Sequence, residues 1–174
     1  MTDTDTPIFT LRQVAAATGW NLGTMRDHFV KGVFPWHEGD GKARVAGSTS
    51  LLSLRAAIRL GIAFQLWSLG VSPKNAFKAA TTFTDFGTAP SSNEFGLSRL
   101  AGNIFPDGYD TILLWRPGQG ARVMPTDEGG FVNINQFICA PFSGESGPVA
   151  LVRVEDVVEA VMAALLPDGD FPAA

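Results

Sequence analysis

The chain has 174 residues, of which 45% are hydrophobic and 17% charged, with a net charge of −4; it can bury the core of one ordinary domain or two small ones, and its acidity argues against nonspecific coating of nucleic acid. A single cysteine, Cys139, excludes a disulfide framework and a cysteine-built zinc site. The polar, acidic start of the chain and the interrupted apolar run 56–69 fit neither a signal peptide nor a membrane span, so we expect a cytoplasmic protein with no membrane partner.

Two short helices are predicted near the start of the chain. The first runs from Leu11 to Thr18, because Thr10 begins a capping-box pattern and Gly19 can end the helix in the left-handed conformation. The second runs from Leu22 to Val30 and is capped by Asn21. Its predicted polar face, flanked by Arg26 and Asp27, consists of Thr24, His28 and Lys31.

A turn-rich stretch, residues 35–47, follows the second helix. It contains Asp40-Gly41, a dipeptide typical of tight two-residue turns, because such turns need a positive φ. We therefore expect a short β-hairpin that turns at this dipeptide and carries basic residues on its return arm.

Two longer helices are predicted after the hairpin. The first spans residues 51–69, and the second spans 73–83 with Ser72 as its cap and Pro73 in its first position. Arg55 and Arg59 lie one turn apart on the first of these helices, and a solvated face is the expectation for both, with contact to phosphate as the alternative.

Beyond a linker-like stretch at residues 87–93 the pattern changes from helices to strands. Strands are predicted at 111–115, 121–124, 131–135 and 149–152, the last of them buried, and a helix at 155–165. The expected fold class is α+β: four helices and a hairpin, followed by a small α+β unit that ends in a helix. The expected division is a tail (1–7), a first domain (8–86), a linker (87–96), the α+β unit (97–167) and a second tail (168–174).

Charge is distributed unevenly over this plan. Residues 9–78 contain nine basic and three acidic side chains, whereas residues 91–174 contain four arginines and eleven acidic side chains. A basic segment joined to an acidic one indicates that the first meets a polyanion and the second does not. The alternative is a chance distribution of a modest number of charges.

Several segments of the first half occur in the order and spacing of a known family. They are Thr10–Ala15, Thr18-Gly19, Thr24–Arg26, Lys31–Pro35 and Leu66–Pro73. Together they resemble the helix-turn-helix of MerR-type winged-helix proteins over residues 8–83. The resemblance implies a winged helix-turn-helix with its second helix in the major groove of duplex DNA and its hairpin wing on the backbone or minor groove.

The resemblance also assigns residues. Arg26 matches the helix arginine that approaches phosphate, and Arg44 matches the wing arginine. Asp27 stands where the family has an aromatic residue, and Ala46 stands at the wing tyrosine position. The family's long dimerising helix is replaced here by the α+β unit. The candidate DNA-contacting residues are Arg12, Thr24, Arg26, His28, Lys31, Lys42 and Arg44.

The sequence thus predicts a double-stranded DNA-binding protein of a bacterium or phage. One such module buries little surface, so we expect a homodimer or higher homo-oligomer, with the second half dimerising or binding a protein partner. The leading hypothesis is a transcriptional regulator. The alternatives are a phage DNA-packaging protein (small terminase-like), an excisionase-like accessory protein, or a protein-interaction module that has lost DNA binding.

Catalysis and cofactors find little support in the sequence. There is no phosphate-cradling glycine-lysine motif and no complete dinucleotide fingerprint. His37, Glu38 and Asp40 are three metal-ligand types close together, but polar residues are common at a hairpin tip and a fourth ligand is missing. We therefore expect no enzymatic activity, no cofactor and no metal.

Overall fold

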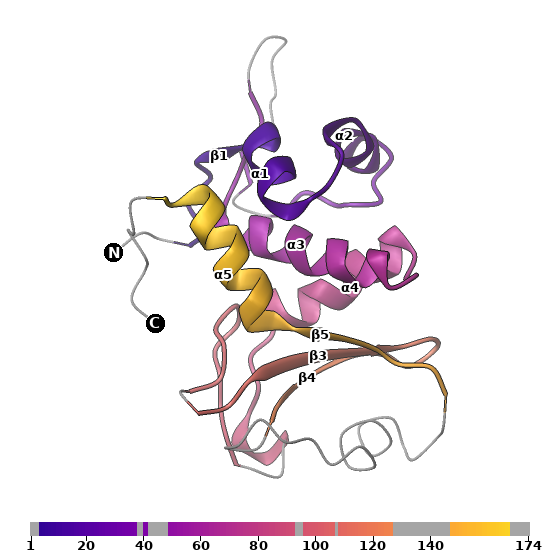
Figure 1. Cartoon of the computed structure of the whole chain (residues 1–174), viewed down its shortest axis with the longest axis vertical. Coiled ribbons are helices and arrows are strands. Elements are labelled where there is room, and N and C mark those ends of the chain that lie inside the picture. Colours follow the sequence, from indigo (N-terminus) through magenta and orange to yellow (C-terminus); the bar gives the residue numbers. More distant parts are fainter. Residues whose placement is uncertain are drawn as a thin grey trace.

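The computed structural model describes residues 4–37, 40–41, 49–92, 96–106, 108–126 and 147–167. This part of the chain has an α+β fold with five α-helices, a two-stranded sheet and a three-stranded antiparallel sheet (Figure 1). Its elements in chain order are β1 (Phe9–Thr10), α1 (Leu11–Thr18), α2 (Leu22–Val30), β2 (Leu51–Leu52), α3 (Leu54–Ser68), α4 (Pro73–Thr84), the 3-10 helix η1 (Pro90–Ser92), β3 (Thr111–Arg116), β4 (Gly120–Pro125), β5 (Ala150–Arg153) and α5 (Val154–Leu165).

Helices α1 and α2 begin and end at the predicted residues. The capping box of α1 is complete, since Thr10 Oγ1 accepts from the backbone N–H of Gln13 at 3.3 Å and Gln13 Oε1 accepts from the backbone N–H of Thr10 at 2.9 Å. Gly19, with φ 84°, ends α1 in the left-handed conformation. Asn21 Oδ1 accepts from two N–H groups in the first turn of α2, at 2.9 and 3.2 Å.

Helix α3 begins three residues later than predicted. Leu51 and Leu52 form β2 and pair antiparallel with β1, so tertiary pairing overrides the helical spacing of their side chains. Ser53 then caps α3, its Oγ accepting from a first-turn N–H at 3.1 Å. Helix α4 begins at Pro73 as predicted, but the side chain of Ser72 makes no capping hydrogen bond. Ser72 is exposed, and water can satisfy the first N–H groups there.

The predicted hairpin does not turn at Asp40-Gly41. Gly41 forms an antiparallel bridge with Leu51, and each residue's N–H donates to the other's carbonyl at 2.9 Å. The chain therefore reverses between these two residues, over a segment that includes 42–48 and lies outside the described residues. Asp40 instead closes a turn with His37, because its Oδ2 accepts from the His37 N–H at 2.9 Å and its own N–H donates to the His37 carbonyl at 3.0 Å.

The second half forms a sheet of strand order β4-β3-β5. Strands β3 and β4 and helix α5 match the predicted elements to within one residue at each end. Strand β5 is only partly buried, contrary to the prediction, because it lies at the edge of this sheet, with Val152 buried and Leu151 43% exposed. The predicted strand at 131–135 lies outside the described residues.

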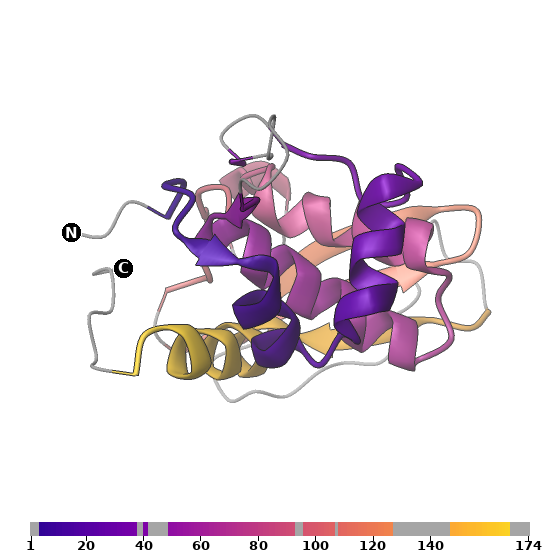
Figure 2. The same ribbon diagram turned by 90° about the horizontal axis from the view of Figure 1, so that it is seen from above.

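The two halves of the chain share one hydrophobic cluster. Helix α5 packs against α1 and α3, and the helices lie on one side of the three-stranded sheet (Figures 1 and 2). Gly61 of α3 permits this close approach, because a Cβ at that position would lie 2.8 Å from Val157 Cγ1 of α5. Residues on both sides of the predicted linker therefore contribute to one continuous core, among them Val14, Leu60, Val154 and Val161. Within the described ranges, no helix is both long and apolar enough to traverse a lipid bilayer.

Candidate nucleic-acid interface

The turn between α1 and α2 is held in place by α3. Trp20, in the middle of the turn, is buried and donates its indole N–H to the carbonyl of Leu60 at 2.9 Å. A Cβ on Gly19 would lie 2.8 Å from the ring of Phe64, so any other residue there would push that ring aside. The angle between α1 and α2 is thus set by contacts with α3, which makes the pair a rigid platform.

A surface depression joins three segments that are distant in the sequence. Its volume is about 490 Å³, and it is lined by residues from the start of α1, the middle of α2 and the chain preceding β2. Arg12 and Arg26 line it from one helix each, and Ser50 lies in the chain directly before β2. Thr10, Leu11 and Thr49 complete the lining.

The electrostatics of this depression favour an anion. Arg12 and Arg26 are exposed and carry full positive charges at neutral pH. The start of α1 adds the positive end of a helix dipole, and the first turns of α1 and α2, which are fully described, hold no acidic residue to offset it. Phosphate and carboxylate oxygens are the anionic groups that guanidinium groups bind, often through two parallel hydrogen bonds.

Helix α2 presents most of its predicted candidates to solvent. Thr24, Arg26 and Lys31 are exposed. Lys31 Nζ lies 3.5 Å from Asp27 Oδ2, one helical turn earlier, and both side chains are 68% exposed, so the pair is weak and rearranges easily.

His28 is the exception among the candidates on α2. Its ring packs against Trp20 and Phe34, at centroid distances of 5.8 and 4.8 Å. Burial lowers the pKa of His28 from 6.5, and the charge of Lys31 lowers it further, although Asp27 acts in the opposite direction. His28 is therefore partly withdrawn from the exposed face and uncharged at neutral pH.

Two candidates, Lys42 and Arg44, lie outside the described residues. The structure describes only the two ends of their segment, where Gly41 and Leu51 pair with each other. The returning end leads directly from the depression, because Ser50, the neighbour of Leu51, is part of its lining.

Arg55 and Arg59 do not belong to a solvated face, contrary to the prediction. Arg59 is 2% exposed, donates from Nε to Thr84 Oγ1 at 2.8 Å and pairs with Asp85. Arg55 pairs with Asp5 and donates from Nη1 to the carbonyl of Thr84 at 2.7 Å. Both guanidinium groups donate hydrogen bonds at the carboxyl end of α4, where the unpaired carbonyls of a helix attract cations. Two of the nine basic residues in the first half are therefore unavailable to a polyanion.

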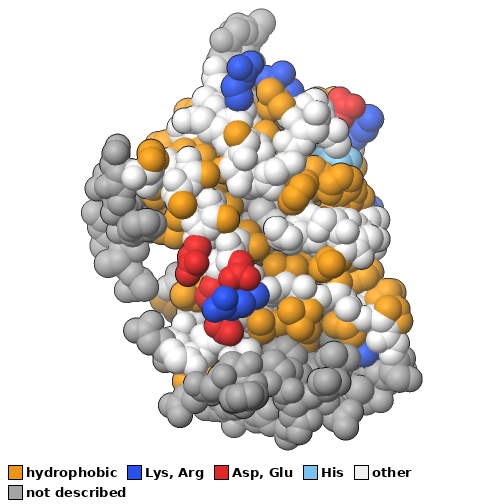
Figure 3. Space-filling view, viewed as in Figure 1, with side chains coloured by type: hydrophobic (Ala, Val, Ile, Leu, Met, Phe, Trp, Pro, Cys, Tyr) orange, Lys and Arg blue, Asp and Glu red, His pale blue; other side chains and the backbone are white. Residues whose placement is uncertain are grey.

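The remaining charges still separate in space. On the face shown in Figure 3, Lys and Arg side chains gather over α1 and α2, whereas Asp and Glu side chains gather near the start of α5. In that second group Arg153 pairs with Asp110 and Asp156, each at 2.8 Å. Glu155 Oε1 accepts from the backbone N–H of Thr111 at 2.6 Å, which ties α5 to β3.

Sequence reasoning missed the lining role of Thr49 and Ser50 and the structural role of Arg99. Arg99 is 6% exposed and donates to backbone carbonyls near the end of α4, including those of Phe83 at 3.0 Å and Phe86 at 2.9 Å. Nothing local in the sequence distinguishes Arg99 from a surface arginine. Thr49 and Ser50 follow a turn-rich segment, and polar residues are expected there whether or not they bind anything.

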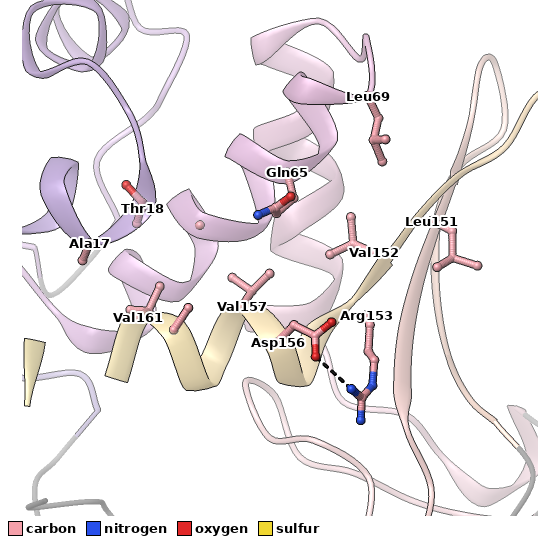
Figure 4. A pocket seen from close by; sticks show the side chains of 12 residues that line it. Ala17, Thr18, Gln65, Leu69, Leu151, Val152, Arg153, Asp156, Val157 and Val161 are labelled. Carbon is pink, nitrogen blue, oxygen red and sulfur yellow. Dashed lines mark hydrogen bonds and ion pairs between the residues drawn. The ribbon is translucent and has the colours of Figure 1, made fainter. Parts of the chain in front are cut away.

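A second cavity, of about 270 Å³, lies between α1, α3, β5 and α5 (Figure 4). Its polar side chains are largely engaged within the protein: Thr18 Oγ1 donates to the Val14 carbonyl at 2.7 Å, and Asp156 pairs with Arg153 at 2.8 Å. In the part of the chain that the structure describes, no three His, Cys, Asp or Glu side chains are grouped to hold a metal ion. This cavity therefore does not display a catalytic arrangement among the described residues.

Comparison of the chain with protein-family models and with curated proteins finds no match. The candidate interface therefore stands on its geometry: a rigid helix pair, a depression with two exposed arginines, and a solvent-facing α2.

Proposed function

We propose that this protein binds double-stranded DNA through a winged helix-turn-helix, in which α1 and α2 are the two helices and the segment between Gly41 and Leu51 is the wing. The observation that carries the proposal is the depression in which Arg12 of α1, Arg26 of α2 and Ser50 of the chain before β2 come together. These are the three segments from which such a module contacts a duplex.

The chemistry of each segment supports this role. Arg12 and Arg26 bind backbone phosphates at the depression, and the positive end of α1 strengthens that contact. Helix α2 is nine residues long with one exposed face, and the major groove, about 12 Å wide, admits such a helix. Lys42 and Arg44 of the wing add two further cations to the same phosphate backbone.

The protein acts as a dimer, and its second half provides the dimerising or partner-binding surface. A single module buries only about 600–1,000 Å² of protein surface on DNA, so two modules are needed for tight, specific binding. A transcriptional regulator of a bacterium or phage is the role we favour. A dimer in solution that binds a palindromic site supports this role, whereas a ring-like oligomer selects a DNA-packaging protein instead.

Fluorescence anisotropy with a labelled duplex over a range of salt concentrations tests the proposal. In wild-type protein the logarithm of the binding constant falls steeply with the logarithm of the salt concentration. The double variant Arg12→Ala/Arg26→Ala reduces that slope by about 2, since each lost phosphate contact removes about 0.9. The matched control is Lys74→Ala/Lys78→Ala, which removes two exposed charges from α4, away from the depression.

Two results overturn the proposal. One is the absence of salt-dependent duplex binding by the wild-type chain. The other is an equal loss of slope in the two double variants, because that outcome means that only the net charge of the protein matters.

A further inference from the structure

The outward face of α2 includes residues that the predicted polar face leaves out. Met25 and Phe29 are buried on the inner side, so Asp27 points most directly outward, with Gly23 and Val30 on one side of it and Thr24 and Lys31 on the other. Val30 is 86% exposed and the side chain of Asp27 is 68% exposed. The exposed face thus carries a carboxylate at its centre and a large apolar side chain at the end of the helix.

These two side chains have narrow binding preferences. An ionised carboxylate is only an acceptor of hydrogen bonds, and beside phosphates it is repelled unless it accepts from a donor. In the major groove the amino group of cytosine is the donor that aspartate contacts, and the methyl group of thymine is the apolar group that an aliphatic side chain contacts.

We propose that Asp27 and Val30 determine the sequence preference of α2, with Asp27 reading a cytosine and Val30 reading a thymine one or two base pairs away. This inference rests on the proposed function. Residues three apart on a helix have Cβ atoms about 5–6 Å apart, a separation that fits base pairs stacked at about 3.4 Å per step. Gly23, which has no side chain, lets this face approach the groove closely.

Lys31 reduces the electrostatic repulsion between the Asp27 carboxylate and the DNA phosphates. Its Nζ lies 3.5 Å from Asp27 Oδ2, so it offsets part of the negative charge before the duplex arrives. On binding, Lys31 can turn to a phosphate while Asp27 accepts from cytosine. His28 takes no part in this reading face, because its ring packs against Trp20 and Phe34.

The first experiment removes a single methyl group from the DNA. A preferred duplex is selected from a random library with the wild-type protein, and each thymine in it is replaced in turn by deoxyuridine. At one position the wild-type protein loses about threefold to tenfold in affinity, while Val30→Ala loses none there. Leu100→Ala, which shortens another strongly exposed side chain, keeps the wild-type response. An equal response of wild type and Val30→Ala at every position overturns the role of Val30.

The second experiment separates affinity from specificity. Asp27→Asn removes a negative charge, so its affinity for unrelated duplexes rises, yet its discrimination in favour of the selected cytosine falls by about tenfold and adenine becomes acceptable, since asparagine reads adenine. Glu159→Gln, an exposed change on α5, alters neither quantity. An unchanged base preference in Asp27→Asn overturns the role of Asp27.

The two levels of the proposal fail differently. If the wild-type protein selects no duplex, the proposed function and this inference both fall. If it selects a duplex and both variants keep its preferences, the DNA-binding function stands and this inference alone is wrong.

Discussion

The arginines of this protein occupy two contrasting environments. Arg12 and Arg26 are exposed beside the depression between α1 and α2. Arg59 and Arg99 are 2% and 6% exposed near the carboxyl end of α4. Burial lowers the pKa of Arg99 to about 10, so the residue remains charged at neutral pH and needs the carbonyl oxygens around it. The same type of side chain is therefore left exposed to solvent in one region and completes a helix end in the other.

The largest expected effect follows from removing the buried charge of Arg99. Arg99→Met removes the hydrogen bonds to the carbonyls at the end of α4 and the contact with the Phe83 ring, whose centroid lies 4.9 Å from Arg99 Cζ. We expect the free energy of unfolding to fall by about 3 kcal/mol, because a buried guanidinium group and its hydrogen bonds to several carbonyls near the end of α4 are lost at once. Urea unfolding followed by circular dichroism measures it.

The exposed arginines supply the control for that prediction. Arg26→Met removes the same charge from the surface of α2, and we expect a change within about 0.5 kcal/mol. A comparable loss of stability in the two variants would mean that the distinction between buried, structural arginines and exposed arginines is wrong.

A second, smaller effect concerns the pair formed by Arg59 and Asp85. Arg59 is almost fully buried, whereas the side chain of Asp85 is 28% exposed. A double-mutant cycle with Arg59→Met, Asp85→Asn and the combined variant isolates their interaction, and we expect a coupling energy of about 2 kcal/mol. Strictly additive losses would show that Arg59 stabilises α4 through Thr84 Oγ1 rather than through Asp85.

The contrast between the arginines also explains how far the sequence predicts the structure. The helix ends at Thr10, Gly19 and Asn21 depend on local hydrogen bonds and backbone preferences, and all three were predicted correctly. The roles of Arg59 and Arg99 depend on partners 26 and 16 residues away along the chain, which no local pattern reveals. Charge counts along the chain treat all arginines alike, so they overestimated the cations available at the candidate interface.

Contacts between residues distant in the sequence also determine which side chains of α2 are exposed. Met25 and Phe29, four residues apart on α2, are both buried, as their helical spacing leads one to expect. It did not reveal that Trp20 and Phe34 would draw His28 partly inward, because those rings come from the turn and from the chain beyond the helix. The remaining exposed stripe is thus a product of tertiary packing.

Gly19 tests how rigidly the α1–α2 turn is held. Gly19→Ala places a Cβ in the left-handed conformation and 2.8 Å from the Phe64 ring. We expect a loss of about 2 kcal/mol in the free energy of unfolding, of which the backbone accounts for about 1 kcal/mol. Gly32→Ala is the matched control, because Gly32 also has a positive φ, of 68°, but a Cβ added there would meet no neighbouring group within 4 Å. Equal losses in the two variants would show that the Phe64 ring shifts readily and does not restrict the residue at position 19.

The smallest expected effect is a pH dependence of the free energy of unfolding that arises from His37, which lies beside the ion pair of Arg59 and Asp85. Burial lowers the pKa of His37 from 6.5, as does the charge of Arg59, while Asp85 and Asp40 act in the opposite direction. The unfolded chain therefore binds a proton more readily than the folded protein, so the stabilisation is complete above about pH 6.5 and is lost as the pH falls below that value towards the lowered pKa. Urea unfolding between pH 8 and pH 5 should show a shallower decline in the free energy of unfolding for His37→Gln than for wild type.

The control for this prediction is a second histidine. The pKa of His28 is also lowered, so His28 contributes a pH dependence of the same sign, and His28→Gln must be measured alongside. Parallel curves for wild type and His37→Gln would show that the proton affinity of His37 is the same in the folded and unfolded states.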